Sequence, residues 1–160
     1  MLRSGALFAA TAMGFAAHAQ APAQQPGDVL AALVGSCWRT QMDNKGPDTD
    51  THCFEEAVGG QMVTDTHKVR NPKGEVVYEG VSVYMLDKPS GALKYEYFYS
   101  TGGKLIGYGW RAGDEIRFGS KPGQEKPDLT WSIGKDSYTV IPASPELGHP
   151  GTFARVPAGQ

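Results

Sequence analysis

Hydrophobic and polar residues alternate along most of the chain in short runs, and turn-forming residues separate these runs about every ten positions. A period of two is typical of strands that bury one face. The expected strands cover residues 36–41, 51–57, 61–70, 75–86, 92–100, 104–111, 115–119, 128–133, 136–141 and 152–156. This pattern predicts an all-β fold, either an antiparallel sandwich or an up-and-down barrel of about 8–10 strands.

A single segment, residues 28–34, has the pattern of a helix. Asp28 can cap its start, and Val29, Leu30 and Leu33 fall on one side of it. We therefore expect a short N-terminal helix that leads into the first strand.

Turn chemistry predicts how the central strands pair. A five-residue loop at 87–91 places Val81 opposite Tyr97 and Glu79 opposite Tyr99. With this register one face of the hairpin is apolar and the other is mixed, as a half-buried sheet requires.

The next turns extend the same face. A two-residue turn at Gly102-Gly103 places Tyr97 opposite Tyr108 and Tyr95 opposite Trp110. A three-residue loop at 112–114 and a turn at 134–135 continue the apolar face in the later hairpins, with Trp110 opposite Ile116 and Trp131 opposite Tyr138. The register thus predicts an interior wall of Tyr95, Tyr97, Tyr99, Tyr108 and Trp110. Such a wall is either a packed aromatic core or the lining of a ligand pocket, because several buried hydroxyls would each need a partner.

The strand at 61–70 admits two registers. A four-residue loop after it would turn Thr64 and Thr66 inward, whereas a three-residue loop would turn Asp65 and His67 inward. We favour the second, because it buries Val63 and Val69 and leaves Lys68 in water. An interior cluster of Asp65, His67, Glu79 and Tyr99 follows, which could hold a polar group or transfer protons. A hydrogen-bonded buried network and an exposed strand are the alternatives.

Cys37 and Cys53 flank a segment rich in turn formers, so they are expected to face each other on two antiparallel strands. A disulfide between them would stabilise the fold by roughly 3 kcal/mol. A zinc site formed by Cys37, His52, Cys53 and His67 is disfavoured, because the spacing contains neither CxxC nor HxxxH. No metal site is predicted.

Residues 1–19 combine Arg3, an apolar run and the small-residue ending Ala17-His18-Ala19, which is the pattern of a secretory signal peptide. We expect cleavage near Ala19, a flexible mature N-terminus at 20–27, and one domain at 28–157. The expected product is soluble and periplasmic or secreted, since no further segment could span a bilayer.

The formal net charge of −2 is small, and the basic residues are scattered. Neither a nucleic-acid surface nor a membrane surface is expected. No GxSxG, HExxH or phosphate-loop motif is present. His149 could reach a haem iron, but a solvated loop histidine is the favoured interpretation, so no cofactor is predicted. The oligomeric state stays open.

The chain resembles a known family in one respect. A short helix that feeds Leu33-Val34-Gly35-Ser36-Cys37-Trp38 into the first of many meandering strands is similar to the calycin or lipocalin-like barrels, especially their exported bacterial members. Lipocalins have Gly-x-Trp at this point, and this sequence is one residue longer. The resemblance implies an antiparallel up-and-down barrel with an apolar ligand inside.

These observations favour a binding protein for a small, partly apolar ligand over an enzyme. The ligand would contact Tyr95, Tyr97, Tyr99, Tyr108, Trp110, Glu79 and His67. One alternative is an isomerase or lyase that uses His67 with Asp65 or Glu79 for acid–base chemistry. The other is a protein-interaction or envelope-maintenance module with a filled barrel.

Overall fold

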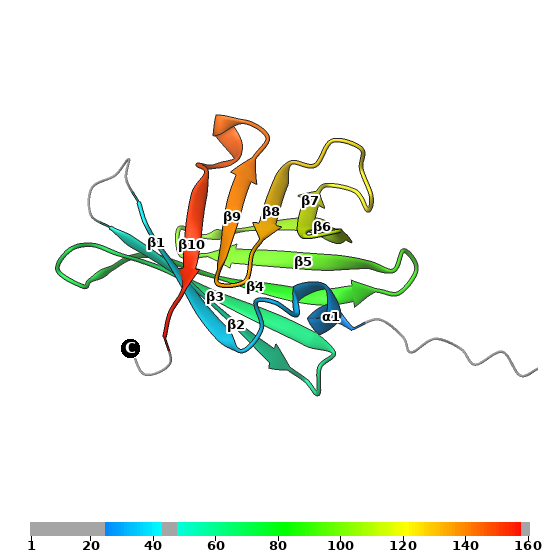
Figure 1. The fold of residues 1–160 in the computed structure, drawn as a ribbon, viewed down its shortest axis with the longest axis horizontal. Helices are drawn as coiled ribbons and strands as arrows, with labels where there is room; N and C mark the ends of the chain where they lie inside the picture. Colours follow the sequence, from blue (N-terminus) through cyan, green and yellow to red (C-terminus); the bar gives the residue numbers. More distant parts are fainter. Residues whose placement is uncertain (1–24, 43–47, 158–160) are drawn as a thin grey trace, which may run out of the picture.

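The strands of the protein close into one antiparallel barrel. In the computed structural model, which describes residues 25–42 and 48–157, each strand pairs with the next along the chain and the last pairs with the first. The strands are β1 (Ser36–Gln41), β2 (Thr49–Ala57), β3 (Met62–Arg70), β4 (Val76–Asp87), β5 (Ala92–Tyr99), β6 (Gly103–Ala112), β7 (Glu115–Gly119), β8 (Leu129–Ile133), β9 (Ser137–Pro142) and β10 (Gly151–Arg155). Figure 1 shows the short strands β8, β9 and β10 running steeply across the long strands β3 to β5. The predicted all-β, up-and-down barrel is confirmed.

Helix α1 (Pro26–Leu30) begins two residues earlier than the predicted segment and is followed by a turn. Pro26 occupies the first turn, where a missing N–H costs nothing, and the Asp28 carboxylate accepts a hydrogen bond from the Gln25 N–H at 2.6 Å. Val29, Leu30 and Leu33 are buried in the core cluster of the barrel. The helix and its turn therefore close one end of the barrel.

Most of the predicted N-terminal segment precedes the first described residue, Gln25. The expected signal peptide at 1–19 lies outside the described residues, as does most of the expected flexible segment 20–27. Neither described helix, α1 nor the 3₁₀ turn η1 (Pro145–Leu147), is long and apolar enough to cross a membrane.

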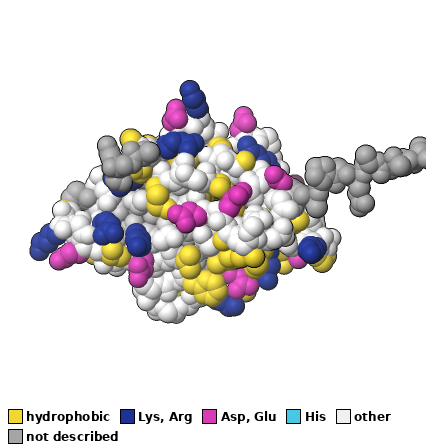
Figure 2. Space-filling view, turned by 90° about the horizontal axis from the view of Figure 1, so that it is seen from below, with side chains coloured by type: hydrophobic (Ala, Val, Ile, Leu, Met, Phe, Trp, Pro, Cys, Tyr) yellow, Lys and Arg dark blue, Asp and Glu magenta, His cyan; other side chains and the backbone are white. Residues whose placement is uncertain are grey.

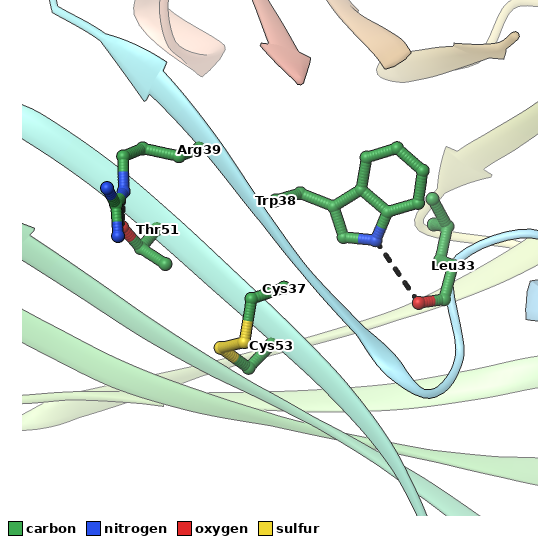
Figure 3. The surroundings of a disulfide bond; sticks show 6 residues. All are labelled: Leu33, Cys37, Trp38, Arg39, Thr51 and Cys53. Atoms are coloured by element: carbon green, nitrogen blue, oxygen red, sulfur yellow. Dashed lines mark hydrogen bonds between the residues drawn. A yellow bond between two sulfur atoms is a disulfide. The ribbon is translucent and has the colours of Figure 1, made fainter. Parts of the chain in front are cut away.

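The Cys37–Cys53 disulfide is confirmed. The two residues are directly opposite in the β1–β2 ladder, with Cα atoms 4.0 Å apart. Figure 3 shows the disulfide on one side of these strands and Trp38 on the other, where its indole N–H donates to the Leu33 carbonyl oxygen at 3.1 Å. The disulfide thus lies outside the barrel, and Trp38 fills the interior.

The predicted register of β4 and β5 is wrong by one residue. Asp87 pairs with Ala92, so the loop has four residues, 88–91, and Ser82 rather than Val81 is opposite Tyr97. The Asp87 side chain accepts a hydrogen bond from the Ser90 N–H, and Gly91 closes the turn with a φ of +69°. Because the side-chain period is two, the slip turns the even-numbered residues of β4 inward.

The pairing of β5 with β6 also differs from the prediction. Gly103 belongs to the strand and pairs with Tyr99, so the loop is 100–102. Tyr95 then faces Gly107, where a Cβ atom would come within 2.6 Å of the tyrosine ring. Tyr95 and Tyr99 therefore lie over glycines of β6, Tyr97 faces Leu105, and Tyr108 and Trp110 are on the outer face.

Two later hairpins also differ from the predicted register, one by a single residue and the other by two. Strand β6 continues to Ala112, which pairs with Glu115, so Arg111 rather than Trp110 faces Ile116. Trp131 pairs with Val140 instead of Tyr138, but the shift of two residues keeps both aromatic side chains in the buried core.

Candidate functional site

The interior of the barrel holds a cavity of about 290 Å³. Its apolar walls come from Tyr95, Phe118, Leu129 and Trp131, and its polar side comes from the histidines and carboxylate of β2 and β3 together with Tyr97. Trp131 is buried, and its indole N–H has no hydrogen-bond partner among the described residues. The cavity therefore offers an apolar wall, a polar end and an unpaired donor on one of its lining residues.

The polar end is built by two facing strands. His52 on β2 and His67 on β3 are directly opposite in the ladder, and their rings stack with centroids 4.2 Å apart. Asp50 and Asp65 lie on the same inner face, two residues before each histidine. We call these four residues the His–Asp cluster. The cross-strand pairs of this cluster are 13 residues or more apart in the chain, and they meet because the turn of the β2–β3 hairpin fixes its register.

Each histidine is held by a hydrogen bond at Nδ1 and has the Asp50 carboxylate close to its Nε2. His52 Nδ1 lies 2.7 Å from Asp65 Oδ2, and its Nε2 lies 3.6 Å from Asp50 Oδ1. His67 Nδ1 lies 2.9 Å from the Tyr97 hydroxyl, and its Nε2 lies 2.8 Å from the same Asp50 oxygen. The contact between His67 Nε2 and Asp50 is close, but it is not aligned as a hydrogen bond, and neither atom has another hydrogen-bond partner among the described residues.

A second tyrosine continues this network. The Tyr97 hydroxyl lies 2.8 Å from the Tyr78 hydroxyl, and the Tyr78 ring packs edge-on against His67 at 5.4 Å. Burial raises the pKa of Tyr97, and the neighbouring Tyr78 hydroxyl raises it further. Tyr97 is therefore a neutral hydrogen-bonding group at physiological pH.

The charges of the cluster shift the pKa values of its members in opposite directions. Burial would lower the pKa of His52, but the charge of Asp65, the hydrogen bond to Asp65 and the nearby Asp50 carboxylate raise it to about 10. Burial would raise the pKa of Asp50, but the close imidazole nitrogens of His52 and His67 and their charge lower it to about 2. An imidazolium at His52 therefore lies between two carboxylates.

The predicted placement of the third strand is confirmed in part. Val63, Asp65, His67 and Val69 face inward, as the three-residue loop required. The partner of His67 is Gly80 and not Glu79, because the register differs by one residue. Glu79 is exposed on the outer face, opposite Lys68, so it cannot cooperate with His67.

The other predicted site residues separate into two groups. Tyr95 and Tyr97 line the cavity, and Tyr99 lies on the same face of β5 beside Tyr97 at a ring distance of 5.7 Å. Tyr108 and Trp110 are half-buried on the opposite face of β6, away from the interior. The predicted aromatic wall is thus reduced to the tyrosines of one strand.

A second cavity lies beside the polar end. Strands β1 and β10 share only two paired positions, and beyond Thr40 a cavity of about 620 Å³ is lined by Asp50, His149, Gly151 and Phe153. Asp50 therefore borders this opening, while His52 and His67 border the interior cavity. His149 is exposed, and it lines the same second cavity as Asp50.

Asp50 was absent from the sequence-based candidates, and His52 entered only through the disfavoured zinc site with the cysteines. The sequence nevertheless contains a hairpin signal that could have identified Asp50 and His52. The Gly59-Gly60 pair centres a hairpin whose register places His52 opposite His67, and Asp50 follows by alternation along β2. The cysteines are excluded as their partners, because they are joined to each other on the outside.

Comparison with known proteins identifies no family for this chain. No family model matches it, and no significantly similar curated protein was found. The geometry of the barrel interior is therefore the basis for a functional conclusion.

Proposed function

We propose that the barrel binds a small, partly apolar molecule in its interior cavity, with the polar group of that molecule directed toward His67 and Tyr97. The observation that supports this most strongly is the cavity of about 290 Å³ with an aromatic wall and one polar end. Ligand sites commonly combine apolar walls with a few convergent polar groups. A cavity of about 150 Å³ admits benzene, so this one suits a molecule of about two rings in size.

The cavity also bears on the alternatives. A filled barrel that acts only through its outer surface does not fit an interior with this much space. Acid–base catalysis keeps one supporting observation, because His67 lines the cavity and its Nε2 lies 2.8 Å from Asp50. Such chemistry would use His67 with Asp50 or Asp65, and it requires the same bound molecule.

A titration with 2-naphthol, which has two rings and a hydroxyl group, tests the proposal. Isothermal titration calorimetry should show saturable binding of one molecule per chain. Leu105 lines the cavity, whereas Ile106 is on the opposite face of β6, and both are about half exposed, at 55% and 50%. Leu105→Trp should block the cavity and abolish binding, and Ile106→Trp should leave it unchanged. Equal effects of the two substitutions would contradict an interior site.

The natural ligand can be sought directly. Native mass spectrometry of the protein purified from its own host should show a mass above that of the chain. The same added mass should be missing from the Leu105→Trp variant and present in Ile106→Trp.

A further inference from the structure

The polar end of the barrel has an arrangement that goes beyond ligand binding and does not depend on it. Three atoms converge there from three side chains: Asp50 Oδ1, His52 Nε2 and His67 Nε2. All three lie within 4.8 Å of one another. We propose that Asp50, His52 and His67 bind one divalent first-row transition metal ion, such as Zn²⁺.

The distances between the Asp50 oxygen and the two imidazole nitrogens fit ligands of one metal ion better than they fit two hydrogen bonds. Ligand atoms around a tetrahedral zinc ion, each about 2.0–2.1 Å from it, are separated by roughly 3.3 Å. The Asp50 oxygen lies 2.8 Å from His67 Nε2 and 3.6 Å from His52 Nε2, on either side of that value. The closer pair is not aligned as a hydrogen bond, so the two atoms do not satisfy each other and each still needs a partner.

The outer nitrogens of both rings are held in the manner of metal-binding histidines. A histidine that binds metal through Nε2 donates its Nδ1–H to a carboxylate or another acceptor, which fixes the ring and its tautomer. Here His52 Nδ1 faces Asp65 at 2.7 Å, and His67 Nδ1 faces the Tyr97 hydroxyl at 2.9 Å. Asp65 and Tyr97 are therefore positioning residues for the two ligands.

Charge balance favours a cation at this point. Asp50 and Asp65 are both buried, with 9% and 1% of their surfaces exposed, and among the described residues neither pairs with a lysine or an arginine. Two buried carboxylates are costly unless positive charge lies beside them. A divalent ion bound to neutral imidazoles neutralises both, and it takes the place of the proton on His52.

The donor set also indicates the kind of metal. Two imidazoles and one carboxylate suit Zn²⁺, Fe²⁺, Co²⁺ or Cu²⁺, whereas Mg²⁺ and Ca²⁺ prefer oxygen ligands. Three protein ligands leave at least one position for water or for a donor atom of a bound molecule. His52 and His67 line the interior cavity, so this position is accessible to its contents.

The test uses the full chain with its disulfide intact, freed of metal by a chelator and titrated with Zn²⁺ by isothermal titration calorimetry. One Zn²⁺ should bind per chain, and Mg²⁺ at the same concentration should not compete. Failure of the unaltered protein to bind one Zn²⁺ would overturn the proposal, whatever the behaviour of any variant. The titration contains no organic ligand, so its outcome is independent of the 2-naphthol experiment.

Variants locate the site. Asp50→Asn and His67→Gln should each weaken Zn²⁺ binding by at least tenfold, and Asp65→Asn by roughly 10–100-fold through its effect on His52. His149→Gln is the matched control, a histidine outside the cluster, and should leave the affinity unchanged. Binding that survives both His67→Gln and Asp50→Asn but is lost in His149→Gln would show a surface site and refute the assignment.

A spectroscopic measurement tests the site without substituting any of the three proposed ligands. Co²⁺ added to the metal-free protein should give a visible absorption band typical of a site with few ligands, and Zn²⁺ should abolish it. Tyr97→Phe keeps the ring and removes the acceptor for His67 Nδ1, so it should shift this band while one Co²⁺ still binds. An unchanged band in Tyr97→Phe would show that Tyr97 does not position a metal ligand.

Discussion

The two ends of the barrel interior differ although the same strands build them. At the end closed by α1, Trp38, Phe54 and Tyr138 are buried and packed ring against ring, with Trp38 and Tyr138 edge-on at 5.5 Å. At the other end lies the His–Asp cluster, bordered by the interior cavity and by two further cavities that Asp50 lines. We call these the aromatic end and the polar end.

Strand β2 shows how sharp the change is. Its inward residues are Asp50, His52 and Phe54, so a single step of two residues separates a histidine of the cluster from a fully buried phenylalanine. The two rings are nearly parallel, with centroids 6.3 Å apart. The aromatic end therefore supplies stability, and it holds in place the strands that carry the polar groups.

The outer surface adds a third environment. Among the described residues, no histidine is visible on the face shown in Figure 2, where hydrophobic side chains gather in one area beside acidic and basic ones. Several large apolar residues are exposed, among them Phe98, Ile106 and Ile141. Polarity alone therefore does not separate the inside of this barrel from its outside.

The largest effect is expected at the aromatic end. Phe54→Ala should lower the free energy of unfolding by about 3–5 kcal/mol, because it removes a ring that packs against Trp131 and Tyr138. Urea denaturation followed by circular dichroism measures this. Phe54→Leu should lose clearly less, and an equal loss in both variants would argue against tight packing there.

Reduction of the disulfide should act on both ends together, because β1 and β2 contribute to each. The bridge joins residues 16 positions apart, and its loss should cost roughly 3 kcal/mol in the chain-entropy description. Thermal denaturation with and without reductant, or of a Cys37→Ser/Cys53→Ser variant, measures the change. Mass spectrometry after alkylation without reductant should show no label, and labelling at both cysteines would contradict the bridge.

A smaller loss is expected at the polar end. Tyr97→Ala removes a half-buried ring that lines the cavity, and the freed groups of His67 and Tyr78 can be hydrated there. We expect a cost of about 1 kcal/mol together with weaker 2-naphthol binding. A loss as large as that of Phe54→Ala would show that the two ends are packed alike.

The last test is a dependence on pH that only the polar end should show. The folded pKa of His52 is raised to about 10 from an ordinary value of 6.5, so in chelator-treated protein its stabilisation is complete below pH 6.5 and is lost as the pH rises through 10. The stability deficit of His52→Gln should therefore shrink between pH 6.5 and 10. The deficit of Phe54→Ala, two residues away, should stay constant, and parallel curves would contradict the raised pKa.

The sequence by itself determined the strands and the class of fold. Alternation with period two located each strand to within about two residues, and the disulfide followed from two cysteines placed across one turn. Alternation also decided the inward face of β3, because only one choice buried Val63 and Val69. Where one face of a strand is clearly apolar, local chemistry is enough.

Only the tertiary structure decided the register of β4 to β6 and, with it, the site. Strand β4 carries valines on one face and tyrosines on the other, so polarity did not choose between them, and a loop shorter by one residue reversed every side chain. The same sensitivity placed glycines of β6 beneath two tyrosines of β5. Asp50, His52 and His67 meet because turn lengths, barrel closure and packing are settled together, and no single stretch of sequence contains that information.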